Sequence, residues 1–408
     1  MLPGINIKFD NGNIGTVVST ADGIFGLLAS AVAVADKFAL NTAYSVRGMA
    51  DVAKLGILPD VDNGVLYRKL NEFYAEAGEG TKLWLMGFAK DTTPSEWFTP
   101  AAGTGIVPAK TLLDASNGEI SLLMTSFDPN GAYVITLETG LDEDVWLAKA
   151  AAQTFCEDYT NNAFSPLIVL LEGYAYSGTA ADLPSLLEGT DNRVGIFIGD
   201  SQKRTGDVTN NSAGNQIVSG RLANIQVHEN AGKVKLGELA TTTAFIVDAP
   251  VETVDVESLH DKGYITFRTH VRRAGYYISD DPLATGLDDD YHYITRRRTI
   301  DKAYRIAHNV ASREILNDFD VNNDGTISPF YAKTVEGNIE QEIYNQMTQR
   351  GELSADSTNK DDLGVRARFN TDINVAQTSR LEISLKVRPK GYARWIEITL
   401  GYDVNLNN

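Results

Sequence analysis

The sequence contains one cysteine, Cys156, so no disulfide can form within the chain. A lone thiol fits a protein that folds in a reducing compartment. Cys156 ends an apolar, helix-like stretch at 146–156. Because free cysteines are usually buried, we interpret it as a structural thiol rather than a nucleophile.

Positive charge is also scarce, since the formal net charge is −18 at pH 7. A nucleic-acid-binding surface needs a basic stripe that displaces counterions from phosphates, and none is evident. The one dense basic cluster, 296–298, follows three aspartates at 288–290. We expect this cluster to form ion pairs within the subunit or across a subunit contact, and we expect no nucleic-acid partner.

Long hydrophobic runs are missing. The most apolar segment, 23–40, has an uninterrupted part of about 13 residues, against the roughly 20 that cross a bilayer. The N-terminus has no basic region ahead of an apolar run, so we predict neither a signal peptide nor a membrane span. The segment 23–40 is interpreted as buried core.

The motifs of common enzymes are absent as well. There is no GxGxxG, Walker A loop, GxSxG elbow or HExxH, and the five histidines are not spaced like metal ligands. The run Gly199-Asp200-Ser201 follows a predicted strand, but its polar sequel lacks a helix-capping pattern. We therefore predict no catalytic residue and no cofactor.

Apolar runs alternate with helical periodicity over residues 21–260. This alternation predicts an α/β domain with a mostly parallel sheet covered on both faces. We expect strands at 82–88, 120–127, 166–173 and 193–200, with helices at 62–77 and 142–158. The domain boundary is predicted near residue 260.

The remaining sequence predicts an α+β module of two helices and a sheet over 261–390. A helix at 297–317 places Ile300, Tyr304 and Ala307 on one apolar stripe that we expect to face the core. A second helix is expected at 329–350, followed by strands at 365–373, 381–387 and 395–402.

The connection between these helices resembles a calcium loop. Asp320, Asn322 and Asp324 alternate before a glycine, as the oxygen ligands of such loops do. Position twelve, which should supply a bidentate glutamate, is Tyr331. Turn chemistry alone explains a connection rich in Asp, Asn and Gly, so we favour no metal here.

Both ends of the chain are predicted to be strands with one apolar face. These arms span 1–20 and 391–408, and their apolar positions are Ile5, Ile7 and Phe9, and Ile396, Ile398 and Leu400. Exposed in a monomer, such strands invite aggregation. Each arm could pair within its own subunit or add to the sheet of a neighbouring subunit. Either arrangement would bury its apolar face, and the residues alone do not decide between the two.

Three stretches together resemble a known family: 275–278 (Gly-Tyr-Tyr-Ile), 289–291 (Asp-Asp-Tyr) and 297–303 (Arg-Arg-Thr-Ile-Asp-Lys-Ala). They are similar to the C-terminal domain of contractile tail sheath proteins, which form the sheaths of myophage tails, R-type tailocins and contractile injection systems. The weaker resemblance of 212–237 points the same way. No large inserted outer domain is evident, which distinguishes this chain from the longer sheaths.

The resemblance implies a homo-oligomer of stacked rings, or helical tube, around a tail tube protein, with a baseplate and a tail terminator as further partners. It implies a virion tail or phage-tail-like particle assembled in the bacterial host cytoplasm, with arms that add strands to neighbouring subunits. Two other hypotheses remain: an α/β enzyme with a cation-assisted carboxylate site, and a calcium-dependent binding module.

Overall fold

A computed structural model describes residues 21–205, 210–359 and 361–402. The predicted N-terminal strand positions Ile5, Ile7 and Phe9 lie outside these ranges. The chain divides into two compact units, Met1–Ile315 and Leu316–Asn408.

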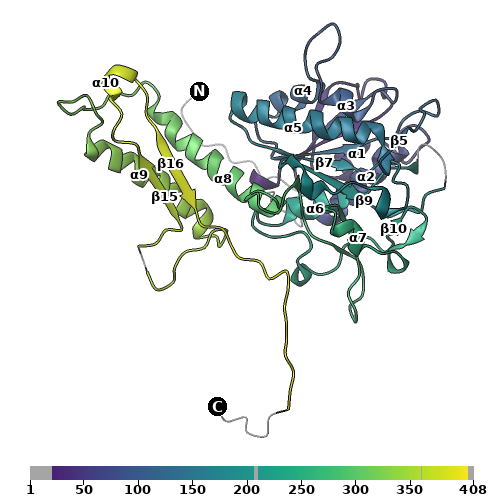
Figure 1. Ribbon diagram of the computed structural model, residues 1–408. Helices are drawn as coiled ribbons and strands as arrows, with labels where there is room; N and C mark the ends of the chain where they lie inside the picture. Colours follow the sequence, from purple (N-terminus) through teal and green to yellow (C-terminus); the bar gives the residue numbers. More distant parts are fainter. Residues whose placement is uncertain (1–20, 206–209, 360, 403–408) are drawn as a thin grey trace, which may run out of the picture. The chain divides into compact units, whose positions relative to one another are not determined.

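The first unit is built on one eight-stranded sheet in the order β13-β12-β9-β7-β4-β1-β3-β2 (Figure 1). The six central strands pair in parallel, and the two edge strands, β13 and β2, are antiparallel to their neighbours. The strands are β1 (Phe25–Ser30), β2 (Ala43–Val46), β3 (Leu83–Phe88), β4 (Leu122–Ser126), β7 (Ile168–Glu172), β9 (Val194–Ile198), β12 (Ile265–Arg268) and β13 (Tyr277–Ile278).

Helices cover both faces of this sheet, with α5 (Glu143–Ala163) on one face and α2 (Gly64–Ala77) with α6 (Asn215–Asn224) on the other (Figure 1). Every residue of β1, β4, β7 and β9 is buried, which explains why these strands are continuous apolar runs in the sequence. The expected mostly parallel sheet is present.

Shorter elements connect these layers. The remaining helices are α1 (Met49–Lys54), α3 (Pro94–Trp97), α4 (Pro108–Ala115), α7 (Glu257–His260) and α8 (Ile294–Ala311). Two-residue strands form small separate pairs: β5 (Leu137–Glu138) with β6 (Leu141–Asp142), β8 (Thr190–Asp191) with β14 (Ala284–Thr285), and β10 (Phe245–Ile246) with β11 (Ala249–Pro250).

The predicted boundary near residue 260 differs from the division in the structure. Strand β12 pairs in parallel with β9, Ile265 opposite Phe197, so residues beyond 260 complete the sheet. Helix α8 also belongs to the first unit, which extends to Ile315. The 261–390 segment expected as one module is therefore divided between the two units.

The second unit consists of a helix and a β-hairpin. Helix α9 (Pro329–Ile343) continues as a π-helical turn, Tyr344–Thr348, and together they bury Val335, Ile339, Ile343 and Met347, which recur every four residues. Strands β15 (Val365–Phe369) and β16 (Ile383–Val387) pair antiparallel, and β15 packs on α9. A four-residue helix, α10 (Val375–Thr378), lies in the connection between them.

The strand predicted at 395–402 is absent from the described part of the arm. Residues 388–402 form neither strand nor helix. Strand structure requires a paired partner, and the apolar positions here face solvent instead: Ile396 is 75% exposed, Ile398 82% and Leu400 94%. The strand prediction is therefore wrong for the single chain.

Candidate functional site

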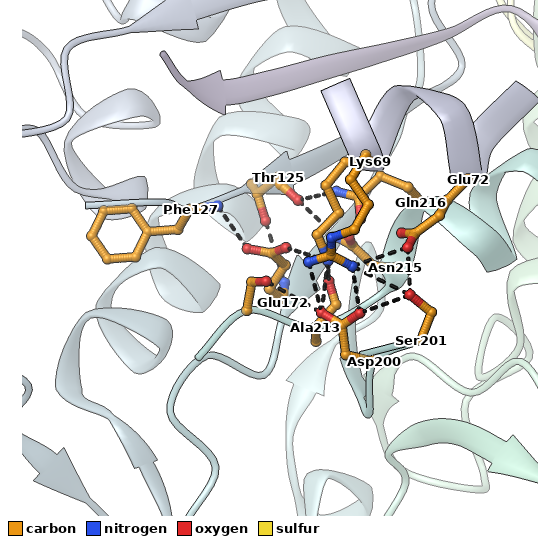
Figure 2. A network of polar contacts seen from close by, with 12 residues as sticks. Lys69, Glu72, Thr125, Phe127, Glu172, Asp200, Ser201, Ala213, Asn215 and Gln216 are labelled. Atoms are coloured by element: carbon orange, nitrogen blue, oxygen red, sulfur yellow. Dashed lines mark hydrogen bonds and ion pairs between the residues drawn. The ribbon is translucent and has the colours of Figure 1, made fainter. Parts of the chain in front are cut away.

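The carboxyl ends of the central strands carry a buried polar network (Figure 2). Glu172 ends β7, and Asp200 follows β9 in the run Gly199-Asp200-Ser201. Ligands of parallel α/β sheets bind at this edge, so the network is the first place to look for an active site.

Two basic residues of α2 enter the network and meet Asp200. The ammonium of Lys69, which is 0% exposed, donates to Asp200 Oδ2 at 3.0 Å. The guanidinium of Arg68 donates to Asp200 Oδ1 at 2.6 Å and to Glu72 Oε1 at 2.9 Å. Burial alone would raise the pKa of Asp200, but these two cations hold it well below its ordinary value.

Glu172 behaves in the opposite way. Burial raises its pKa to about 8, against the opposing effects of Lys69 and the Phe127 amide. The Lys69 ammonium lies 3.7 Å from Glu172 Oε1, and the Phe127 N–H donates to Oε2 at 2.6 Å. The two carboxylates thus differ in charge state near neutral pH, as acid and base residues often do.

The cavity that borders the network at Glu172 is nevertheless too small for a substrate. The cavity beside Glu172 and Phe127 measures about 10 Å³, no more than the space of one water molecule. The side-chain amides of Asn215 and Gln216 on α6 both donate to the backbone carbonyl of Thr125, at 3.0 and 2.8 Å respectively. The arrangement binds α2 and α6 to the strand ends, which is a structural role.

A larger hollow of about 870 Å³ lies elsewhere in the first unit, beside Arg221, Glu238 and Tyr276. Its buried cation, Arg221, donates to Glu76 Oε2 at 3.0 Å and to the carbonyls of Gly237 and Glu238 at 2.8 and 2.5 Å. The guanidinium is thus occupied by the protein itself. The thiol of Cys156 is buried, and burial raises its pKa to about 12.

The core positions Ile300, Tyr304 and Ala307 predicted on α8 are only partly buried. Ile300 and Ala307 are half-buried and Tyr304 is 36% exposed, whereas Ala303, Ile306 and Val310 are buried. Ile300, Tyr304 and Ala307 lie at the margin of the buried face because charged side chains of α8 are buried there in ion pairs: Asp301 meets Arg193 at 3.2 Å and Lys302 meets Asp22 at 2.7 Å. A helix face that is buried through ion pairs does not show an apolar periodicity in the sequence.

The Asp320 loop is closed by its own hydrogen bonds. Asp324 Oδ1 accepts from the Thr326 amide at 3.0 Å and from its hydroxyl at 2.7 Å, and the Asn322 amide donates to that hydroxyl at 2.9 Å. The side chain at position twelve, Tyr331, stacks on Phe319 with ring centroids 4.8 Å apart. Across the described ranges, no group of three or more His, Cys, Asp or Glu residues is placed to hold a metal ion.

The hairpin of the second unit presents the remaining candidate surface. Its apolar face, turned to α9, contains Val365, Ala367 and Phe369, with Ile383, Leu385 and Val387 opposite them. Beyond Arg388 the arm exposes a run of apolar side chains: Trp395, Ile396, Ile398, Leu400 and Tyr402. Within the described residues the hairpin contains two strands only, so it offers a free edge to a further strand.

Solved structures with the same fold include contractile sheath proteins. The helical sheath of the anti-feeding prophage (AFP) in its contracted state aligns with a TM-score of 0.62 at 17% sequence identity, covering 99% of each chain. A chain of the 6-fold symmetrised AFP baseplate gives 0.62 at 16% identity with the same coverage. The contracted sheath complex of PVC, an extracellular contractile injection system, gives 0.60 at 15% identity, covering 99% of this chain and 98% of that one.

The likeness at these identities establishes a shared fold, so the chain has the fold of contractile sheath proteins. Residues 2–282 match the family description "DUF2586, N-terminal domain", and residues 290–407 match "DUF2586, C-terminal domain". The chain belongs to the DUF2586 family. No curated protein matches its sequence.

No helix in the described ranges has the length and apolar character needed to cross a membrane.

Proposed function

We propose that this protein is the structural subunit of a contractile, phage-tail-like sheath. Its copies form a helical tube of stacked rings around a tail tube and, on contraction, drive that tube through a target envelope. The observation that carries the proposal is a sheath-protein fold extending over 99% of the chain. The cavity of about 10 Å³ beside Glu172 is too small for a substrate, which supports a structural role.

Strand exchange between subunits is the proposed means of assembly. The C-terminal arm, through Ile396, Ile398 and Leu400, adds a strand to the hairpin of a neighbouring subunit, and the N-terminal arm, through Ile5, Ile7 and Phe9, extends the same sheet beside that added strand. Support comes from the exposed apolar positions of the C-terminal arm and from a hairpin with an unfilled edge. Backbone hydrogen bonds between subunits would keep the tube connected while subunits rotate.

The partners follow from this role: further copies of the chain, a tail tube protein, a baseplate and a tail terminator. The proposed location is a virion tail or phage-tail-like particle, assembled in the bacterial host cytoplasm. The resemblance to sheath proteins implies no catalytic residue, no cofactor and no nucleic acid. Two packings of similar free energy, separated by a barrier, would store the energy of contraction.

Negative-stain electron microscopy of the purified protein tests the proposal. We expect tubes or stacked rings for the full chain, and their loss on deleting residues 393–408 or 1–18. Deletion of 403–408 alone is the matched control, because it leaves Ile396, Ile398 and Leu400 in place and should preserve assembly. A monodisperse monomer at all concentrations, insensitive to every deletion, contradicts the sheath role.

A further inference from the structure

The two edges of the hairpin differ. Arg388 N–H donates to Gly364 O at 2.8 Å and Asn370 N–H donates to Glu382 O at 2.9 Å, so even-numbered residues face the partner strand at both ends of the ladder. Antiparallel pairing alternates along each strand. The amides of odd-numbered residues therefore point outward, along the free edge of β15 on one side and of β16 on the other.

Carboxylates of α9 occupy the free edge of β15. The amide of Ala367 donates to Glu340 Oε1 at 2.8 Å, and that of Phe369 donates to Glu336 Oε1 at 2.8 Å. Arg368 lies over both carboxylates, 3.0 Å from Glu336 and 3.4 Å from Glu340. A strand arriving on this side would have to displace buried, charge-assisted hydrogen bonds.

The free edge of β16 carries no such cover among the described residues. Its outward amides belong to Ile383, Leu385 and Val387, whose side chains are half-buried on the α9 side of the hairpin. A further strand with apolar residues at alternate positions would extend that apolar face and complete its burial.

We propose that the hairpin accepts a strand only at its β16 edge, and that the strand is segment 394–402 of a second copy, antiparallel, with Glu397 opposite Lys386. The inference rests on the proposed function, in which arms join neighbouring subunits. It adds which edge is used, which residues guard the other edge, and the register of the contact.

The register follows from two patterns that coincide. Placing Glu397 opposite Lys386 puts the three apolar residues of the arm beside those of β16 in the pairs Ile396–Val387, Ile398–Leu385 and Leu400–Ile383. The alternate positions then pair Thr399 with Ser384 on the solvent side. A slip by one residue would turn the whole apolar set to solvent.

Charge favours the same register. Arg366 and Lys386 are directly opposite on the outer face of the hairpin, both are exposed, and neither has an ion-pair partner among the described residues. Like charges in directly opposite positions destabilise a strand pair. A carboxylate from a third strand beside Lys386 relieves that repulsion. A parallel strand with the same apolar matching would place Thr399 there and Glu397 beside Ser384, so the antiparallel direction is preferred.

Cysteine cross-linking tests the edge and the register. Ser384 and Thr399 would form a non-hydrogen-bonded pair, whose Cα separation of about 4.5 Å suits a disulfide. Chains carrying Ser384→Cys are mixed with chains carrying Thr399→Cys, assembled and oxidised. The matched control pairs Thr399→Cys with Arg368→Cys on the β15 edge. The native Cys156 is buried and does not compete.

We expect a covalent dimer from the Ser384→Cys mixture and none from the control. Tubes that cross-link through Arg368→Cys instead would overturn the inference while the sheath role stands. Absence of tubes from the unmodified protein is a different result, and it contradicts the proposed function. A single chain carrying both Ser384→Cys and Thr399→Cys reports pairing within one subunit: a cross-linked monomer, together with no dimer from the mixture, overturns the second copy as occupant.

Charge reversal tests the ion pair independently. Lys386→Glu and Glu397→Lys alone should each raise the protein concentration needed for assembly about 1.5- to fivefold, the range that cross-strand charge pairs span. The double variant should assemble as the unmodified chain does. Lys390→Glu, outside the proposed pairing, is the control and should leave assembly unchanged. A double variant that assembles no better than either single variant contradicts the register.

Discussion

Glu336 on α9 accepts a hydrogen bond of 2.8 Å from the backbone N–H of Phe369 on β15. The carboxylate is 3% exposed and also meets Lys333 and Arg368 at 2.5 and 3.0 Å. The Glu336 carboxylate thus accepts the hydrogen bond that the Phe369 N–H, at the edge of β15, would otherwise donate to an added strand. The fold of the second unit and the choice of its contact edge therefore depend on the same side chain.

Replacing this side chain tests the edge contact. Glu336→Ala leaves the buried Phe369 amide without an acceptor and should lower the free energy of unfolding of the second unit by about 1–3 kcal/mol. Glu336→Gln retains an oxygen acceptor and should cost less. Urea denaturation followed by circular dichroism measures both. Equal losses would assign the effect to the ion pairs with Lys333 and Arg368 rather than to the hydrogen bond.

The same carboxylate predicts a sensitivity to acid. Burial acts to raise the pKa of Glu336, but Lys333, the Phe369 amide and Arg368 together hold it below its ordinary 4.5. A folded pKa below the unfolded one means that the stabilisation is complete above about pH 4.5 and is lost as the pH falls through the folded value. Unfolding measured between pH 6 and 3 should show this loss in the unmodified protein and a smaller one in Glu336→Gln.

In the first unit, the two carboxylates near Lys69 should respond differently to neutralisation. Asp200→Asn leaves the buried Lys69 without an ionised partner and Arg68 with Glu72 alone, and should destabilise the unit by about 3–5 kcal/mol. Glu172→Gln replaces a group that is largely protonated near pH 7 and should cost much less. Thermal unfolding of the two variants gives the comparison. Similar losses would mean that Glu172 is ionised in the folded protein.

Glu172 also predicts an opposite pH dependence. Burial raises its folded pKa from 4.5 to about 8, so the folded state binds the extra proton between these values. Its contribution is therefore largest below pH 4.5 and is lost as the pH rises towards 8. Glu172→Gln should flatten this decline when stability is measured from pH 5 to 8.5. An unchanged slope in the variant would locate the titrating group elsewhere.

Calcium should leave the protein unaffected. The oxygens of Asn322 and Asp324 sit in a turn closed by Thr326, and Tyr331 occupies the position of the missing glutamate. We expect the same melting temperature in millimolar calcium and in EDTA, and no calcium dependence in Asp320→Ala. A rise with calcium that Asp320→Ala abolishes would restore the binding-module hypothesis.

The central sheet could be predicted because each strand carries its own signal. The runs at 82–88, 120–127, 166–173 and 193–200 all became buried parallel strands, since a strand covered on both faces needs apolar residues throughout. The position of Pro329 at the start of α9 likewise follows from local sequence.

Features that depend on distant partners could not be predicted. Lys69 and Asp200 are far apart in sequence, and neither residue's neighbours indicate the other. The buried face of α8 contains Asp301 and Lys302, which a search for apolar periodicity assigns to solvent. The strand at 395–402 failed for a related reason: its pattern is that of a strand, but no partner is available to it within the described part of one chain.

Asp22 lies immediately after the N-terminal arm and contacts α8 through Lys302 at 2.7 Å and Arg305 at 3.0 Å. Tension on the arm would therefore reach this pair of salt links before it reached β1. Helix α8 is thus linked by ion pairs to the start of the described chain at Asp22. A force that a neighbouring subunit applied to the N-terminal arm would act on α8 before it could separate β1 from the sheet. In the proposed tube, a load on the N-terminal arm would therefore enter the first unit through α8.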